Sequence, residues 1–203
     1  MNSLDIFLAK SLGLVIKNNL GQRTLQRIEK RLFEKFGINM TQSLLEFHKL
    51  DIVLREFFGA GADGLERKFF ENTVALDKEN QDQEWVIIKD QALSEVILEA
   101  FGDEDKKLIL NTLLGKPLII QQVLDTCKIP QTSGYRKINS LIQNGLLVAE
   151  GFITTNDGKK VNKYTTLFEN LKIDIEKNKI IIKVKLKKDE LQNSSVIHVM
   201  RGL

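Results

Sequence analysis

The sequence predicts an α+β protein that is mainly helical, and three patterns indicate this class. Apolar residues recur at spacings of three and four through residues 1–76, as they do on the buried face of a helix. The same spacing returns between residues 103 and 144. Apolar and polar residues then alternate in two pairs of runs, within 146–168 and 171–186, which is typical of antiparallel hairpins. We therefore expect a helical N-terminal domain and a mixed second half.

The first domain, residues 1–76, is expected to be a set of amphipathic helices. Gly37 is placed where a glycine ends a helix. Thr41 is expected to cap the helix that follows. The predicted helices of this domain cover residues 4–19, 24–36, 41–58 and 65–76.

Residues 77–102 are expected to connect the two halves of the chain. The stretch 77–84, DKENQDQE, is polar throughout and predicts a linker. The apolar run Trp85–Ile88 predicts a short strand, and a helix follows over 91–100.

Residues 103–170 carry the most informative order of elements. A first helix opens on acidic residues at 103–105, where negative charge is favourable, and a second spans 120–127. A break at Pro130 leads to a third helix at 132–144. A hairpin then turns at Asn156-Asp157-Gly158. Three helices followed by a two-stranded hairpin is the order of a winged helix-turn-helix domain. Residues 171–203 are expected to add a C-terminal β-hairpin and a tail.

The third helix of this domain has one face without apolar or acidic residues. Arg136 and Asn139 lie on it, and these side chains bind guanine and adenine edges in two-pronged fashion. We expect those two residues to read bases. The residues expected to hold the sugar–phosphate backbone are Thr132, Ser133, Tyr135, Lys137 and the lysines of the hairpin. The DNA-binding residues expected on and before this helix are Gln131, Thr132, Ser133, Tyr135, Arg136, Lys137, Asn139 and Ser140. Gly134 is expected to let the helix pack closely on its neighbours.

The hairpin and the charge distribution point to the same polyanionic partner. Lys159, Lys160 and Lys163 cluster at and after the hairpin tip, and we expect all three to contact DNA. Residues 115–188 contain 14 basic against 6 acidic residues, a net charge of +8, whereas residues 1–90 contain 13 against 14. A basic segment beside a neutral one is typical of a nucleic-acid-binding module attached to another domain.

The stretch Lys128–Ile138, with Leu141-Ile142 and Asn144–Leu147 after it, resembles archaeal and bacterial winged-helix transcription regulators of the ArsR/MarR type. The resemblance covers about residues 103–170. It implies that residues up to Tyr135-Arg136 open a recognition helix and that Gly145-Leu146 leads into the wing. The metal-sensing cysteines and histidines of ArsR proteins are missing from the sequence, so metal sensing is not implied.

The first domain resembles an archaeal output domain of the Nitrosopumilus type over about residues 5–76. The resemblance is carried by Glu34–Ile38, Leu54–Ala62 and Leu65-Glu66. It implies a role in signalling, with no chemistry of its own.

Other patterns favour a structural interpretation over a chemical one. Gly59–Gly64 reads G-x-G-x-x-G, but a helix is expected before it, where nucleotide-binding proteins have a strand. We interpret it as a turn with close helix packing. The single cysteine, Cys127, lies on an apolar stripe and is expected in the core. With two histidines and no nucleophile–base pair, we expect no enzyme, no metal site and no cofactor. No secretion leader or membrane span is expected, which predicts a cytoplasmic protein.

The sequence thus predicts a DNA-binding transcription regulator. Its expected partners are double-stranded DNA, a second copy in a homodimer, and an effector or signalling protein at the N-terminal domain, with no membrane. The alternative is a winged helix that docks proteins within transcription or signalling machinery. One strand stays open to interpretation, because Lys183, Lys185 and Lys187 alternate with apolar residues. Its apolar face covers this domain's own sheet, the N-terminal helices or a second subunit.

Overall fold

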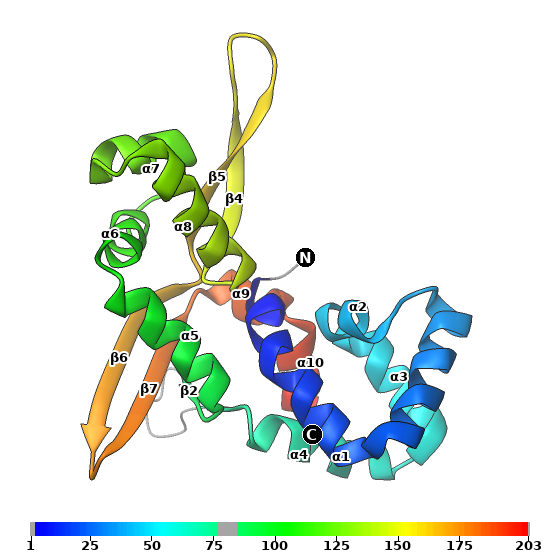
Figure 1. The fold of residues 1–203 in the computed structure, drawn as a ribbon. Helices are drawn as coiled ribbons and strands as arrows, with labels where there is room; N and C mark the ends of the chain where they lie inside the picture. The colour runs from blue at the N-terminus through cyan, green and yellow to red at the C-terminus, as the bar shows by residue number, and fades with distance from the viewer. Residues whose placement is uncertain (1–2, 77–84, 203) are drawn as a thin grey trace.

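The computed structural model describes residues 3–76 and 85–202, and it is an α+β fold with antiparallel sheets (Figure 1). The linker predicted at 77–84 lies outside the described residues. The first half contains α1 (Ser3–Phe36), α2 (Met40–Leu45), α3 (Phe47–Phe58), α4 (Gly61–Glu71), β1 (Val74–Leu76), β2 (Trp85–Ile88) and α5 (Gln91–Gly102). The second half contains α6 (Glu104–Leu113), β3 (Leu118–Ile119), α7 (Ile120–Cys127), α8 (Gln131–Gln143), β4 (Leu147–Thr154), β5 (Lys160–Thr166), β6 (Phe168–Glu176), β7 (Lys179–Leu186), α9 (Lys188–Asn193) and α10 (Ser195–Gly202).

The N-terminal helices follow the predicted stripes with five corrections. The helix expected over 41–58 is two helices, α2 and α3, divided at Glu46, and the helix expected from residue 65 begins at Gly61. The two helices expected before Gly37 form one element, α1, which is kinked at Gly21 (φ 71°, ψ 161°). Asn39, and not Thr41, caps the next helix, since its side chain accepts a hydrogen bond from the N–H of Gln42. The helix expected to reach Leu76 ends at Glu71, and Val74–Leu76 forms strand β1 instead.

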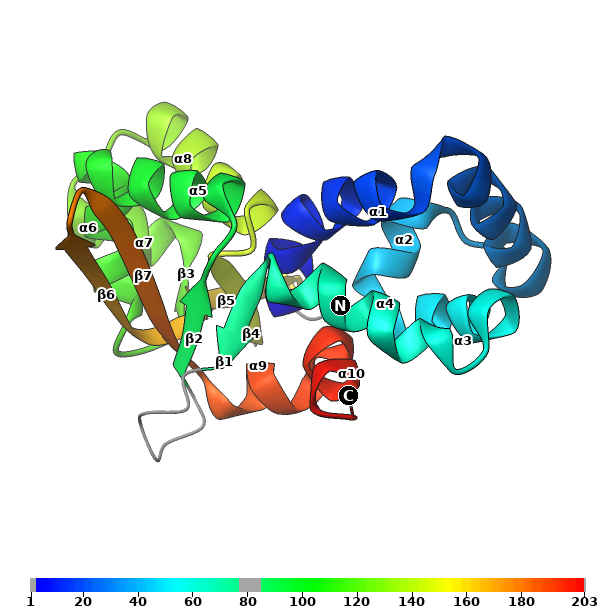
Figure 2. The same cartoon turned by 90° about the horizontal axis from the view of Figure 1, so that it is seen from below.

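The larger sheet joins distant parts of the chain in the order β1-β2-β7-β6 (Figure 2). β2 pairs antiparallel with β7, with Val86 opposite Val184, and β7 pairs with β6 across a two-residue turn. The strand predicted at 85–88 and the hairpin predicted at 171–186 are thereby confirmed. The apolar face of β7 covers its own protein: Ile182, Val184 and Leu186 are buried.

The smaller sheet has the order β3-β5-β4, and α6, α7 and α8 pack beside it. The three helices α6, α7 and α8 and the two strands β4 and β5 confirm the elements predicted within residues 103–170. α8 covers Gln131–Gln143. β3 was not predicted. It is only two residues long and pairs with β5, Leu118 opposite Tyr164 and Ile119 opposite Lys163.

One apolar cluster runs through both halves of the molecule. Leu4 and Phe7 of α1 meet Val184 of the larger sheet and Leu146 after α8 around a small apolar cavity. A Cβ on Gly145 would lie 2.7 Å from the nitrogen of Phe7, so only glycine allows this approach.

Hydrogen bonds also tie the last helices to the first. The buried carboxylate of Asp5 accepts hydrogen bonds from the hydroxyl of Ser194 and from the N–H (3.0 Å) and hydroxyl (2.8 Å) of Ser195. Glu190 accepts hydrogen bonds from the N–H groups of Ser3 and Leu4. The start of α1 is therefore held by α9 and α10. Within residues 3–76 and 85–202, no helix has the length and apolar character needed to cross a bilayer.

Candidate nucleic-acid interface

The junction between α7 and α8 fixes the direction of α8. Lys128 ends α7 in the left-handed conformation (φ 54°), and the N–H of Ile129 donates to the carbonyl of Leu124. Pro130 follows and α8 begins at Gln131. A Cβ on Gly134 would lie 2.3 Å from Cδ2 of Leu124, so the close packing predicted for Gly134 is confirmed. The turn and this contact together hold α8 tightly against α7.

The buried face of α8 is apolar and its opposite face is open to solvent. Ile138 and Leu141 are buried against the core. The side chains exposed on the other side are Gln131, Thr132, Tyr135, Arg136, Asn139 and Gln143, while Ser133 and Ser140 are half-buried. The structure thus brings most of the predicted base- and phosphate-binding residues of α8 together on one solvent-facing surface, which we call the α8 face.

The first turn of α8 presents main-chain donors beside this face. No side chain caps the helix at Pro130, and the hydroxyl of Ser133 donates to the carbonyl of Pro130. Helix N-termini with unoccupied N–H groups favour anions such as phosphate. Gln131 is steadied by a hydrogen bond from its amide to Gln121 of α7 (3.2 Å).

Lys137 is directed away from the α8 face. Its ammonium lies 2.7 Å from a carboxylate oxygen of Asp103 and 2.9 Å from one of Asp105, at the start of α6. The hydrogen bond from Lys137, followed by that from the N–H of Lys106, lowers the pKa of Asp103. The same carboxylates raise the pKa of Lys137. Lys137 therefore joins α8 to α6, and we leave it out of the proposed DNA contacts.

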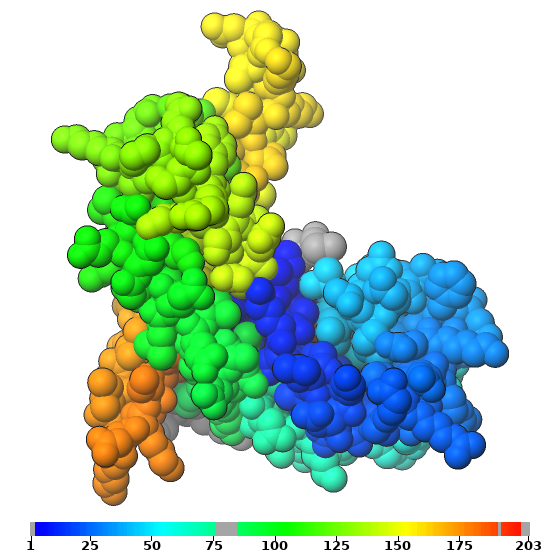
Figure 3. All heavy atoms as spheres, viewed as in Figure 1, coloured from blue at the N-terminus to red at the C-terminus, as the bar shows by residue number. Residues whose placement is uncertain are grey.

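The β4–β5 hairpin stands clear of the rest of the molecule (Figures 1 and 3). Its tip is closed by hydrogen bonds from the N–H of Thr155 to Lys159 and from the N–H of Gly158 to Thr155, both 2.9 Å. Gly158 takes φ 78° in this turn, so the predicted Asn156-Asp157-Gly158 turn is confirmed.

The three hairpin lysines differ in their surroundings. Lys159 is highly exposed, and its ammonium lies 2.8 Å from a carboxylate oxygen of Asp157, which is also exposed. Lys160 is exposed, and its ammonium stands 4.6 Å from the ring centroid of Phe152. Lys163 is half-buried opposite Ile119 of β3, nearer the base of the hairpin. The tip therefore offers two solvent-facing ammonium groups and one exposed aromatic ring.

Phe152 and the carboxylates that hold Lys137 were not predicted from the sequence. Phe152 follows a bulge between Ala149 and Phe152, which turns this apolar side chain towards solvent. Gly151 (φ 76°) was the available signal for that bulge. Asp103 and Asp105 are 34 and 32 residues from Lys137, and no local pattern links them.

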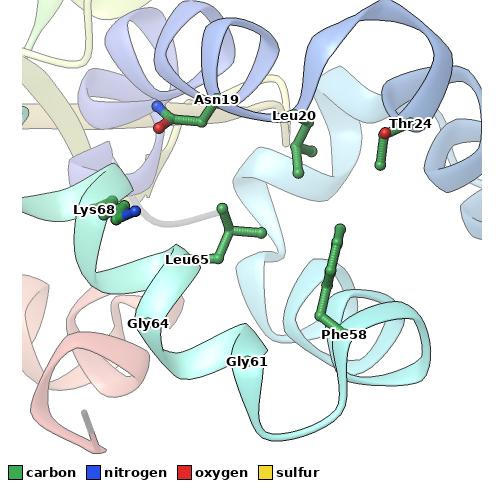
Figure 4. A pocket seen from close by; sticks show the side chains of 8 residues that line it. All are labelled: Asn19, Leu20, Thr24, Phe58, Gly61, Gly64, Leu65 and Lys68. Carbon is green, nitrogen blue, oxygen red and sulfur yellow. The ribbon is translucent and has the colours of Figure 1, made fainter.

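The glycine segment of the N-terminal half borders a separate hollow of about 400 Å³ (Figure 4). It follows α3 and opens α4, so it has helices on both sides, unlike a dinucleotide-binding loop. A Cβ on Gly59 or Gly64 would meet nothing within 4 Å, so the close packing predicted at these glycines is wrong. Leu20, Phe58 and Leu65 line the hollow, with Lys68 at one end.

Comparison of the chain with known protein families, curated proteins and solved structures finds no match. Among the residues that the structure describes, no three histidine, cysteine, aspartate or glutamate side chains are grouped to hold a metal ion. Cys127 is buried as predicted, with its sulfur 3.3 Å from the hydroxyl of Thr112.

Proposed function

We propose that the chain is a sequence-specific DNA-binding transcription regulator in which α6 to β5 act as a winged helix. The helix–strand–helix–helix–strand–strand order and the sheet order β3-β5-β4 support this proposal. α8 is the proposed recognition helix and the β4–β5 hairpin the proposed wing.

The observation that carries the proposal is the α8 face, a solvent-exposed helix surface of donors and amides without an acidic side chain. Arg136 and Asn139 are three positions apart in the sequence, so both project from the same side of the helix. Their side chains suit guanine and adenine edges in a major groove. The open first turn and Thr132 suit a phosphate at the groove's rim.

The hairpin supplies the second proposed contact. Lys159 and Lys160 provide charges for the backbone of the duplex. Tyr135 and Ser133 complete the proposed backbone contacts from α8, and Gln131, Ser140 and Lys163 flank them. We assign signal input to the N-terminal helices, where the hollow beside Phe58 and Lys68 is large enough for a small molecule.

The test is selection of bound fragments from random double-stranded DNA by the purified full chain, at a stated salt concentration. We expect a recurrent sequence, bound with an affinity that falls steeply as salt rises. A DNA affinity that does not change with salt concentration, or a selection that returns no recurrent sequence, would overturn the proposal. In that case, capture of an acidic protein through the same face would favour the docking role.

A further inference from the structure

The strand β6 lies at the edge of the larger sheet and pairs on one side only, with β7 (Figures 1 and 2). β6 is nine residues long, and its pairing with β7 is regular from Leu171 to Glu176. Natural proteins shorten, bulge or cover such edges to prevent pairing with other chains. The opposite edge strand, β1, has three residues, and the outer edge of β4 is broken by its bulge. β6 is therefore the longest regular strand edge that the described residues leave open.

The exposed part of this hairpin is also apolar. Ile173, Ile175 and Ile180 are 37%, 74% and 48% exposed. Ile173 and Ile175 share one face of β6, and Ile180 lies opposite Ile175 on β7. The buried Ile182 and Val184 continue the same face towards the core. The apolar face of the sheet thus extends beyond what its own chain covers.

The turn of the hairpin determines which main-chain groups point outwards. Lys177 and Asn178 form a two-residue loop with positive φ, 49° and 64°. In such hairpins the two residues that flank the loop, here Glu176 and Lys179, form a hydrogen-bonded pair. Along the two strands, hydrogen-bonded pairs then alternate with pairs whose main-chain groups point away from each other. The N–H and C=O groups of Ile173 and Ile175 consequently face the free edge, together with the C=O of Leu171, while the N–H of Leu171 donates to the side-chain oxygen of Asn170 (2.8 Å).

We propose that β6 pairs antiparallel with β6 of a second copy, about a twofold axis at Ile173. This register places Ile173 opposite itself and Leu171 opposite Ile175, so the outward main-chain groups of both strands meet. It also places Lys172 opposite Asp174 on both sides of the axis. The two exposed isoleucine patches join on one face, because this twofold axis is perpendicular to the sheet.

The charges along β6 select this register over its neighbours. A twofold axis at Lys172 brings two lysines face to face, and an axis at Asp174 brings two aspartates face to face. Like charges opposite one another destabilise strand pairing, and opposite charges stabilise it. The ammonium of Lys172 lies 4.7 Å from the ring centroid of Trp85, which holds that side chain on the polar face of the sheet. The strand is therefore complementary to its own copy, and this complementarity is independent of DNA binding.

The test is a charge swap followed by sedimentation equilibrium over a wide concentration range. Lys172→Asp and Asp174→Lys each create two like-charge pairs and are expected to weaken dimerisation about tenfold or more. The double variant Lys172→Asp/Asp174→Lys restores opposite charges and is expected to dimerise as the unaltered chain does. Lys177→Asp makes the same charge change in the exposed two-residue loop of this hairpin, outside the pairing edge, and is the matched control. A chain that stays monomeric, or single variants that dimerise normally, would overturn the proposal.

A second measurement needs no substitution and so is independent of folding defects. Amide hydrogen exchange by NMR is expected to show that protection of Ile173 and Ile175 increases with protein concentration. The amides of Lys172 and Asp174, which face β7, are expected to be protected at every concentration. Fast exchange of the amides of Ile173 and Ile175 at high concentration would contradict the pairing.

Discussion

The ammonium of Lys137 lies 2.7 and 2.8 Å from the two carboxylate oxygens of Asp103, and this contact fixes α8 to the start of α6. It sets the rotation of α8 about its own axis, because Lys137 lies on the flank between the buried and exposed faces. The proposed base-reading residues are thus oriented by a pair that lies outside the proposed DNA contacts.

Replacing Lys137 with methionine is therefore expected to change stability and not the salt dependence of DNA binding. The free energy of unfolding should fall by about 0.5–1 kcal/mol, the range for partly exposed ion pairs. The pKa of Asp103 should rise, since its main source of lowering is lost. NMR titration of Asp103 and urea unfolding measure both effects. A reduced salt slope would show instead that Lys137 contacts phosphate.

Arg136→Ala is expected to reduce affinity for the selected DNA sequence by about 1–3 kcal/mol and to relax specificity at one base pair. The reason is loss of a two-pronged contact to a base edge. Fluorescence anisotropy with the selected duplex and its single-base variants measures the change. Arg23→Ala, an exposed arginine on α1, is the control and should bind as the unaltered chain does. An unchanged base preference in Arg136→Ala would contradict the reading role.

Lys159→Ala is expected to weaken binding to all DNA sequences by a similar factor, because a phosphate contact carries no base information. The slope of log affinity against log salt should fall in magnitude by about 1. Titrations at several salt concentrations, on selected and scrambled duplexes, measure both quantities. A loss confined to the selected sequence would assign this lysine to base recognition.

Gly134→Ala is expected to lower the free energy of unfolding by about 1–3 kcal/mol, the range for overpacking. The added methyl group must displace Leu124, which is buried between α7 and α8. Gly64→Ala is the matched control, since its site inside α4 is open, and it should gain about 0.5–1 kcal/mol from helix propensity. Urea unfolding compares the two variants, and equal effects would contradict the tight α7–α8 contact.

Glu66 is expected to make stability depend on pH. It is fully buried on α4; this burial, and then the nearby carboxylate of Asp51, raise its pKa to about 8. The unfolded chain loses the Glu66 proton near its ordinary pKa of 4.5, well before the folded chain does. Stability is therefore greatest below pH 4.5 for this group and falls as pH rises towards 8, by a few kcal/mol in order of magnitude.

The matched variant for this titration is Glu66→Gln, which keeps the shape and removes the charge. Its stability should increasingly exceed that of the unaltered chain between pH 5 and 8. Urea unfolding across this range isolates Glu66, because all other titrating groups are shared. Parallel curves for the two proteins would show that Glu66 ionises normally.

The sequence predicted the elements whose signals are local. The bounds of α8 agree with those expected to within one residue, because Pro130 and Gly145 limit the helix at its two ends. The hairpin tip was predicted because Asn, Asp and Gly are the residue types that favour a tight turn between two strands. The α8 face followed from helical periodicity alone, which requires no knowledge of tertiary contacts.

The sequence could not predict features that depend on distant partners. β3 is too short to show alternation, and it exists because β5 pairs with it. The apolar pattern of the preceding helix continues through Val74–Leu76. This segment nevertheless forms a strand, because it pairs with β2. The orientation of Lys137 was missed for the same reason, since its carboxylate partners lie on another helix.

The pairing of β2 with β7, and of Asp5 with Ser194 and Ser195, has a consequence for synthesis on the ribosome. About a hundred residues separate the two strands, and 190 separate Asp5 from Ser195. The apolar surface of α1, α3 and α4 that packs against α9 and α10 therefore stays uncovered until those two helices emerge. We expect the nascent protein to depend on chaperones until that moment and to gain its native protease resistance in a single late step.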